Sequence, residues 1–459
     1  MQLNPKRRFL TRLLLIVAGA LLQLGLQGTA SAQGNTVMEL TLAQAIDLAL
    51  KQNRSLKLAR LAVVDSEQKK KIARAYYFPR IDNESTAFHV TEIQQLVIPE
   101  AALGVDPTIG PIPGKTAVIG QGTFTAYTSG TGLSQPLLQM FKIHQENRAA
   151  TADINSAKIQ VDQAEDDIAL KVRQLYYGIL IAQLNQVTAK EEADAAQVKF
   201  QESTSFVEQG SALEAVALES HAALLGAKQT VLTQNLQIRD LSFELNDLLG
   251  LPLNTQLKLR EDPPAAAASI PARDECVRTA REKSPEIRVA QQAVEKAKAG
   301  LAATKDKYIP DLNAFARYSY QSGIPFLVHN FGTFGFTFTY ELFDGGRRNA
   351  EISESRTMLS KAELNLAKVE EEVTVQVETA YDRVEQIQGL VTVAEELLKV
   401  RAEAARVADR QFEQNKVLAS VPAEAAAKAS SAKASLLEAN LGLSLAQGDL
   451  KRAMGEIPR

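Results

Sequence analysis

The chain repeats much of its own sequence. Residues 137–250 align with residues 342–455 at a shift of 205 positions. A second shift, of 231 positions, places Pro79 on Pro310. The shifts differ by 26 residues, so the first copy holds a longer insertion between its matched blocks. A duplicated unit this large predicts an internally repeated, pseudo-symmetric structure.

The repeat divides the chain into four predicted parts. They are a signal peptide (1–32), a first structural repeat (33–250), a Pro/Ala-rich linker at the equator of the molecule (251–273) and a second repeat (274–459). Each repeat is expected to contain a helix, a strand, a loop, a strand and a long helical hairpin. The predicted fold class is therefore mainly α with a small β part.

The first residues have the pattern of a secretory signal. A basic start is followed by an apolar run at 13–22 and by small residues at 30–32. This order predicts cleavage before Gln33 and export of the mature chain. An uncleaved anchor is the alternative, but Gly19 interrupts the apolar run. No cysteine follows the expected cleavage site, so we expect no lipid anchor.

Composition favours long helices and argues against nucleic acid as a partner. The 51 Lys and Arg nearly balance the 54 Asp and Glu, whereas nucleic-acid binders usually carry a basic face. Ala, Leu, Glu, Lys and Gln dominate the repeated blocks, which is typical of long helices. The single cysteine, Cys276, falls on Ala45 in the repeat register, so we expect it to be a small buried residue.

The sequence contains no recognisable catalytic or cofactor motif. The four histidines are scattered, without metal-like spacing, and no nucleotide-binding loop or nucleophile elbow occurs. Gly345 and Gly346 precede two arginines, an order also found where a helix start binds an anion, but a strand-to-helix turn explains them better. We therefore expect no enzyme activity, no cofactor and no metal centre.

Apolar spacing predicts helices too long for a globular domain. Within residues 359–398 the apolar positions are mostly three and four residues apart, as in a coiled coil. From Leu137 to about Ser205 the pattern runs for roughly 69 residues, or on the order of 100 Å. Breaks are expected near Gly210 and Asn415, because Gly and Asn tolerate a left-handed backbone. Helices of this length form a rod or a tube.

Short strands are predicted between the helices. Phe334, Phe336, Phe338 and Tyr340 alternate with polar or small residues. Residues 312–320 alternate less cleanly, and weaker strands are expected at 83–91 and 123–135. The Pro- and Gly-rich insertion between the last two is expected to be an irregular loop. Four strands cannot close a barrel, so we expect several chains to combine. Three chains would supply about twelve strands, but the strand pattern alone does not fix the number three.

Five strings in the expected order resemble the TolC-like outer-membrane efflux family. They are "LTLAQAIDLALKQN" (40–53), "YFPRI" (77–81), "NDLLGLP" (246–252), "YIPDL" (308–312) and "YELFDGGRRNAE" (340–351). The resemblance covers nearly all of the chain after the signal peptide. It implies a homotrimer with a shared 12-stranded β-barrel in the outer membrane, four strands per chain. It also implies an α-helical barrel of coiled-coil hairpins that extends into the periplasm.

The resemblance also implies partners and a function. A member of this family is a passive exit duct of a tripartite efflux or type I secretion system. It would contact outer-membrane lipid, a periplasmic adaptor protein and an inner-membrane efflux pump or ABC transporter. Phe334, Phe336, Phe338 and Tyr340 would then face lipid.

The resemblance suggests candidate residues at the periplasmic tips. The family carries an aromatic residue and a glycine three positions later; the corresponding residues here are Val207 and Gly210, and Phe412 and Asn415. Nine residues beyond the glycine positions lie Glu219 and Glu424. Glu424 is the better candidate for a ring of carboxylates that narrows the gate, and Glu219 the weaker one. Both could instead be ordinary exposed helix residues.

A soluble periplasmic coiled-coil adaptor or scaffold is the alternative function. An adaptor needs one helical hairpin and a membrane anchor or lipid, whereas this chain is predicted to have two hairpins and membrane-type strands. A hydrolase has no supporting motif. The aromatic strand decides between the first two, because a soluble protein should not expose Phe334, Phe336 and Phe338 together.

Overall fold

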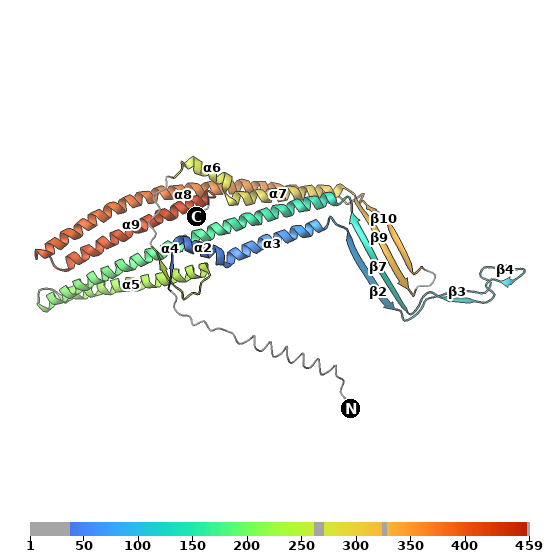
Figure 1. Ribbon diagram of the computed structural model, residues 1–459, viewed down its shortest axis with the longest axis horizontal. Coiled ribbons are helices and arrows are strands. Elements are labelled where there is room, and N and C mark those ends of the chain that lie inside the picture. The colour runs from blue at the N-terminus through green and yellow to red at the C-terminus, as the bar shows by residue number, and fades with distance from the viewer. Residues whose placement is uncertain (1–36, 261–269, 324–327, 457–459) are drawn as a thin grey trace, which may run out of the picture.

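The molecule is an elongated assembly of helices with a small sheet at one end (Figure 1). The computed structural model describes residues 37–260, 270–323 and 328–456. The predicted signal peptide lies outside these residues, and so does the middle of the predicted linker. The coarse prediction of a mainly α chain with a small β part is confirmed.

Two hairpins of long helices form most of the structure. Their helices are α4 (Met140–Glu208), α5 (Glu214–Leu249), α8 (Arg347–Glu413) and α9 (Ser420–Ala453). The 69 residues of α4 span on the order of 100 Å. The predicted breaks are confirmed, since Gly210 has φ 65° and Asn415 has φ 55°.

Shorter helices precede each hairpin. They are α2 (Leu42–Gln52), α3 (Arg54–Ala75), α6 (Arg273–Lys283) and α7 (Pro285–Lys305), followed by the 3-10 turn η1 (Asp306–Tyr308). Thr41 caps α2 and Asn53 caps α3, each through its side chain. Ser284 caps α7, whose first residue is Pro285. These caps fix where α2, α3 and α7 begin, whereas α6 begins without a side-chain cap.

A four-stranded antiparallel sheet lies at the far end of the helices. Its strands, in spatial order, are β10 (Asn330–Thr339), β9 (Asp311–Ser322), β7 (Thr125–Pro136) and β2 (Arg80–His89). All four predicted strands are present, with ends shifted by a few residues. The outer strands β10 and β2 each leave one edge unpaired within the described chain, and no helix covers the sheet (Figure 1).

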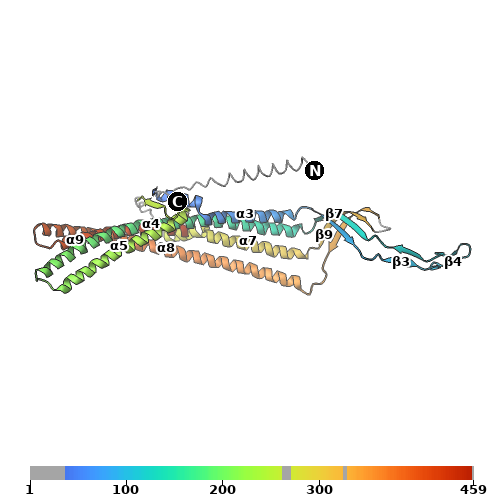
Figure 2. The ribbon, with the colours of Figure 1, turned by 90° about the horizontal axis from the view of Figure 1, so that it is seen from below.

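The insertion of the first repeat is more regular than expected. It contains β3 (Gln95–Ile98), β4 (Val105–Asp106), β5 (Gly110–Pro111) and β6 (Ala117–Gly120), paired as β3–β6 and β4–β5. The prediction of an irregular loop was therefore wrong. Apolar β-branched residues flank the turns and favour strand pairing. The resulting arm extends past the sheet, away from the helices (Figure 2).

A further two-stranded sheet was not predicted. Strand β1 (Val37–Leu40) pairs in parallel with β8 (Gln256–Leu259), which lies inside the predicted linker. The hydroxyl of Tyr176, on α4, shares its single proton between the carbonyl oxygens of Leu40, at 3.0 Å, and Arg260, at 2.7 Å. These bonds tie the strand pair to the middle of the long helix.

The apolar seam predicted for α4 forms much of the core. Most of its predicted positions are buried, including Val172, Leu175 and Ile179. They pack with α2 and α5 in one cluster, while Val373, Val377 and Val384 of α8 pack with α6 and α9 in another. Cys276 and the corresponding Ala45 are both fully buried, as expected for small core residues.

The long helices lie side by side in a layer rather than in a closed bundle. On the hairpin side the order is α5, α4, α9 and α8; toward the sheet it is α3, α4, α7 and α8 (Figures 1 and 2). Helix α4 therefore has neighbours on both sides along its whole length. Helix α8 forms one edge of the layer, and α3 and α5 together form the other.

Candidate functional site

The two hairpin tips lie together at the end opposite the sheet (Figure 1). Gly210 allows the turn between α4 and α5, and Asn415 allows the turn between α8 and α9. Phe412 is exposed, whereas Val207 is partly buried. Each predicted tip residue therefore lies in or directly before a turn.

Two polar contacts join the hairpins near these tips. The Lys199 ammonium of α4 donates to Glu424 Oε1 of α9 at 2.8 Å. One helical turn nearer the tip, Glu202 Oε1 accepts the backbone N–H of Ser420 at 3.0 Å, at the start of α9. A carboxylate is favourable there because the first N–H groups of a helix have no internal partner. Lys199 and Glu202 thus tie the first hairpin to the second.

The structure brings both candidate glutamates close to one lysine. The hydrogen bond and charge of Glu424 raise the pKa of Lys199, and the charges of Glu219 and Glu202 raise it further. Glu424 is partly buried, while Glu219 is exposed on α5. Sequence reasoning missed Lys199 and Glu202. The repeat gave no signal for Glu202, because the corresponding position in the second copy is Val407.

The aromatic strand presents an uncovered apolar face. Phe334, Phe336 and Phe338 expose 85, 72 and 64% of their surface. Tyr340, just beyond the end of β10, is also exposed. Gly335 and Thr337 lie on the opposite face of the strand, because successive side chains alternate. The observed strand therefore has the aromatic and polar faces that the alternation predicts.

Two further apolar surfaces run along the edges of the helical layer. The α8 stripe consists of Leu390, Val393, Leu397, Val400 and Val407. The α5 stripe consists of Leu218, Leu225, Leu232, Leu236 and Phe243. Both follow coiled-coil spacing, yet their side chains are 40–65% exposed. Exposed apolar seams of this length are typical of surfaces that another chain covers.

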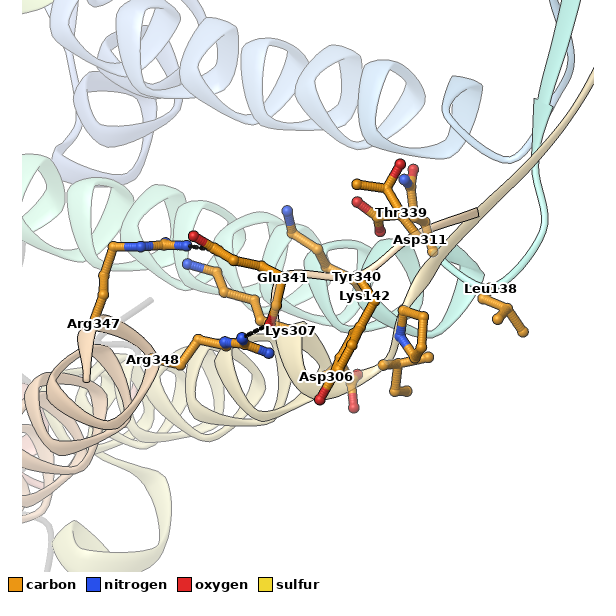
Figure 3. Close-up of a pocket in the computed structure, with 13 residues that line it drawn as sticks. Leu138, Lys142, Asp306, Lys307, Asp311, Thr339, Tyr340, Glu341, Arg347 and Arg348 are labelled. Atoms are coloured by element: carbon orange, nitrogen blue, oxygen red, sulfur yellow. Dashed lines mark hydrogen bonds and ion pairs between the residues drawn. The ribbon is translucent and has the colours of Figure 1, made fainter. Parts of the chain in front are cut away.

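A cavity of about 280 Å³ lies where the sheet meets the helices (Figure 3). Its charged lining residues are Lys142, Asp306, Lys307, Asp311, Glu341, Arg347 and Arg348. Four cations therefore face three carboxylates. This nearly balanced lining gives no strong preference for an anion or a cation.

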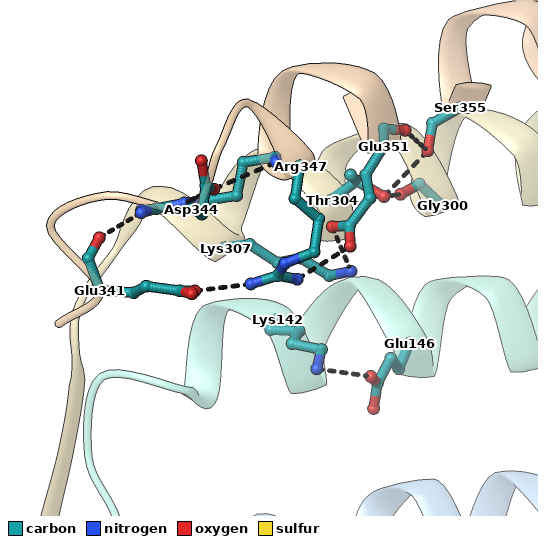
Figure 4. A network of polar contacts seen from close by, with 11 residues as sticks. Lys142, Glu146, Gly300, Thr304, Lys307, Glu341, Asp344, Arg347, Glu351 and Ser355 are labelled. Carbon is teal, nitrogen blue, oxygen red and sulfur yellow. Dashed lines mark hydrogen bonds and ion pairs between the residues drawn. The ribbon is translucent and has the colours of Figure 1, made fainter. Parts of the chain in front are cut away.

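A network of ion pairs fixes the step from β10 into α8 (Figure 4). Asp344 accepts the backbone N–H groups of Gly346 at 3.0 Å and Arg348 at 3.1 Å. The Arg348 guanidinium and these N–H donors lower the pKa of Asp344 to about 2. The chain's own carboxylate thus occupies the start of α8. Gly345 and Gly346 form the predicted strand-to-helix turn.

Asp166 is a carboxylic acid buried in the middle of α4. Only 7% of its surface is exposed, and its Oδ1 has no hydrogen-bond partner among the described residues. Burial, and then the charges of Asp162 and Asp167, raise the pKa of Asp166 to about 6. The native state therefore holds this proton more tightly than the unfolded chain. Its contribution to stability falls as the pH rises from about 4 to about 6.

Replacing Asp166 by asparagine, its neutral isostere, should stabilise the protein. At pH 7, Asp166→Asn is expected to raise the free energy of unfolding by about 1–3 kcal/mol, because the buried charge is removed. Asp167→Asn is the matched control: Asp167 is half-exposed and pairs with Arg452 at 2.5 Å. That variant should lose at most about 1 kcal/mol. Denaturant unfolding at pH 7 compares the two, and a destabilised Asp166→Asn would contradict the pKa assignment.

The described part of the chain shows neither a metal-binding cluster nor a membrane-spanning helix. Among residues 37–260, 270–323 and 328–456, no group of three or more His, Cys, Asp and Glu side chains could hold a metal ion. In the same parts of the chain, no helix has a stretch that is both long and apolar enough to cross a membrane.

Comparison with known proteins identifies relatives along nearly the whole chain. The profile of the outer membrane efflux protein family matches residues 45–251 and 276–456. A search of curated proteins found no match. Among solved structures, the Campylobacter jejuni CmeC outer membrane channel is 16% identical, with a TM-score of 0.75, over 94% of this chain and 92% of its own.

Two further channels share the fold. VceC from Vibrio cholerae is 14% identical, with a TM-score of 0.69, over 90% of this chain and 96% of its own. The Neisseria gonorrhoeae MtrE outer membrane channel is 18% identical, with a TM-score of 0.65, over 90% and 89%. The family profile covers well over half of the sequence, and the similar structures are TolC-like channels. The chain belongs to the outer membrane efflux protein family.

Proposed function

We propose that this protein is a passive exit channel of the outer membrane and works as a homotrimer. The observation that carries the proposal is the pair of uncovered apolar stripes on opposite edges of the helical layer. The α8 stripe of one copy would pack on the α5 stripe of the next. Three layers joined in this way close into an α-helical barrel, which buries both stripes away from solvent.

The sheet supports the same assembly. Its edge strands β10 and β2 leave backbone groups unpaired, and free edges of this kind promote pairing with another chain. Joining β10 of one copy to β2 of the next would combine three four-stranded sheets into a 12-stranded β-barrel. At about 4.8 Å between strands and a tilt of about 40°, its diameter is roughly 24 Å. A barrel of this width has room for a water-filled channel.

The barrel is proposed to cross the outer membrane with Phe334, Phe336, Phe338 and Tyr340 against lipid. Their outward face is apolar, and Thr337 and Gly335 would face the water-filled interior. The helices then extend into the periplasm. We expect no enzyme activity and no cofactor, so the energy for export must come from a partner.

Two structural repeats, 33–250 and 274–459, are proposed to build each copy around the linker 251–273. Helices α2 and α6 support this division. Each has 11 residues, and their first residues, Leu42 and Arg273, are 231 positions apart. The repeats would make the trimer pseudo-sixfold, with twelve helices around one tube.

The channel is proposed to be gated at its periplasmic tips. In each copy the Lys199–Glu424 pair and the Glu202–Ser420 bond would hold the hairpins in one arrangement. Exposed ion pairs contribute only about 0–1 kcal/mol, so a docking partner could exchange them at small cost. The three Glu424 side chains of the trimer would place three carboxylates around the axis. Glu219 of each copy would lie beside them. Val207, Gly210, Phe412 and Asn415 would form the surface that meets the partner.

Replacing Glu424 should change the gate. Glu424→Gln is expected to raise single-channel conductance, because it removes the partner of Lys199 and any carboxylate ring while keeping the side-chain shape. It should also weaken block by divalent cations. Glu219→Gln is the control, since that exposed residue forms no ion pair among the described residues, and it should change conductance less. Unchanged conductance and block in Glu424→Gln would remove Glu424 from the gate.

The proposed partners are those that membership of the outer membrane efflux protein family implies. A periplasmic adaptor protein would dock on the tips and connect them to an inner-membrane efflux pump or ABC transporter. The complete assembly would then be a tripartite efflux or type I secretion system. Outer-membrane lipid would surround the barrel, and the chain itself would need no lipid anchor.

Planar-bilayer recording tests the proposed channel. The purified protein is expected to form discrete conductance steps when it is added to one side of a bilayer. A soluble coiled-coil adaptor or scaffold would leave the bilayer silent. Heat-denatured protein from the same preparation is the control. Conductance that survives the heating would come from heat-resistant contaminating porins rather than from this protein.

A further inference from the structure

The arm formed by residues 91–122 is an apolar hairpin beyond the end of the sheet (Figures 1 and 2). Only four of its 32 residues are charged: Glu92, Glu100, Asp106 and Lys115. The short loop between β9 and β10 offers no counterpart of this length. The arm is therefore a particular feature of the first repeat and needs its own explanation.

Hydrogen bonds hold the arm in a defined shape. Its root continues the β2–β7 ladder, because the Val90 N–H donates to the Phe124 carbonyl at 2.8 Å. Beyond it, β3 and β6 pair in register. At the tip, Asp106 Oδ1 accepts the backbone N–H groups of Thr108 at 2.7 Å and Ile109 at 3.2 Å. The arm thus continues the edge of the sheet and ends in a turn that hydrogen bonds to Asp106 stabilise.

The tip presents large apolar side chains to solvent. Ile109 and Leu103 are 75 and 74% exposed, and Val105 is 68% exposed. Val97 and Val118, which face each other across the β3–β6 pair, are also exposed. A soluble surface seldom leaves so many apolar side chains together without a partner.

We propose that the arm packs against the arms of the two other copies, and that the three tips meet beyond the outer mouth of the channel. The inference rests on the proposed trimeric barrel. In that barrel the three arm roots lie on a rim of about 24 Å diameter, so neighbouring roots are about 21 Å apart. An extended arm from residue 92 to residue 109 reaches up to roughly 50 Å, which is ample for the tips to converge.

This arrangement would bury Leu103, Val105 and Ile109 against their symmetry mates. The arm carries few charges, which favours this packing. Three identical arms in contact would bring like charges close together, and those charges would repel each other. The outer mouth would then be narrowed by an apolar collar. The partner is a second and third copy of this chain rather than a different molecule.

Cysteine cross-linking in outer membranes tests the proposal. The natural cysteine is first removed as Cys276→Ala, since Ala45 fills the corresponding buried position of the other repeat. Ile109→Cys is added at the tip, and Glu92→Cys at the root serves as the matched control. A disulfide needs Cα atoms about 4.4–6.8 Å apart, which tips at the axis can reach and roots about 21 Å apart cannot.

The expected result is covalently linked chains after mild oxidation of Ile109→Cys and none in Glu92→Cys. Tips that do not cross-link in a protein that still forms trimers would overturn the arm contact and leave the channel intact. Equal cross-linking at tip and root would also overturn the arm contact, because it would show that the cysteines react through non-specific collisions. A protein that forms no trimer would overturn the proposed function and this inference together.

A polar tip gives a second measurement. The triple variant Leu103→Ser, Val105→Ser and Ile109→Ser removes the apolar contact without touching the barrel. Its single-channel conductance is expected to rise at least twofold if the collar narrows the outer mouth. Conductance equal to that of the unmodified protein would contradict the collar.

Discussion

Replacing Leu390 and Val393 of the α8 stripe by aspartate is expected to abolish the trimer. Both side chains are at least 60% exposed in the single chain, and the proposed assembly buries them against the α5 stripe of the next copy. An unpaired buried carboxylate costs about 3 kcal/mol or more, and each trimer would carry two at each of three interfaces. Size-exclusion chromatography with light scattering measures the loss directly.

Thr392→Asp is the matched control for this variant. Thr392 is exposed and directly precedes Val393, but it lies about 100° around the helix, on the polar side. It should leave the trimer intact. If Leu390→Asp/Val393→Asp assembled as well as Thr392→Asp, the α8 stripe would not be the interface.

Replacing Phe336 by lysine is expected to prevent most of the protein from entering the outer membrane. A lysine on the lipid-facing side of a barrel costs about 2–4 kcal/mol at the middle of the bilayer, and three copies carry it together. Membrane fractionation and resistance of the folded trimer to detergent measure the effect.

Thr337→Lys separates lipid contact from a general intolerance of the strand. Thr337 is adjacent to Phe336 and lies on the opposite face, which is proposed to line the channel. Lysine there should be tolerated and should change ion selectivity instead. Equal membrane insertion of Phe336→Lys and Thr337→Lys would show that Phe336 does not face lipid.

Periodicity predicted the long helices because their burial repeats along the sequence. The apolar positions of α4 are buried where the coiled-coil spacing places them, and Gly210 and Asn415 adopt the left-handed backbone that hairpin turns need. Strand alternation likewise predicted the exposed aromatic face of β10. These features are local, so neighbouring residues carry enough information.

Long-range and asymmetric contacts could not be predicted in this way. Lys199 pairs with Glu424 across 225 positions, and nothing near either residue signals the contact. The two matched tyrosines show the same difficulty: Tyr176 bonds the β1–β8 pair, whereas Tyr381 lies under the guanidinium of Arg273. The repeats share a backbone plan, but their polar contacts differ because each copy meets different neighbours.

The most direct test of the trimeric duct is the mass and shape of the protein extracted from outer membranes in detergent. Light scattering should give a protein mass near three times 49.9 kDa, or slightly less where the predicted signal peptide is removed. Negative-stain images should show particles about 130–150 Å long, from roughly 100 Å of helix plus a membrane barrel. A monomer or dimer recovered from the soluble periplasmic fraction would contradict the duct and favour a coiled-coil scaffold.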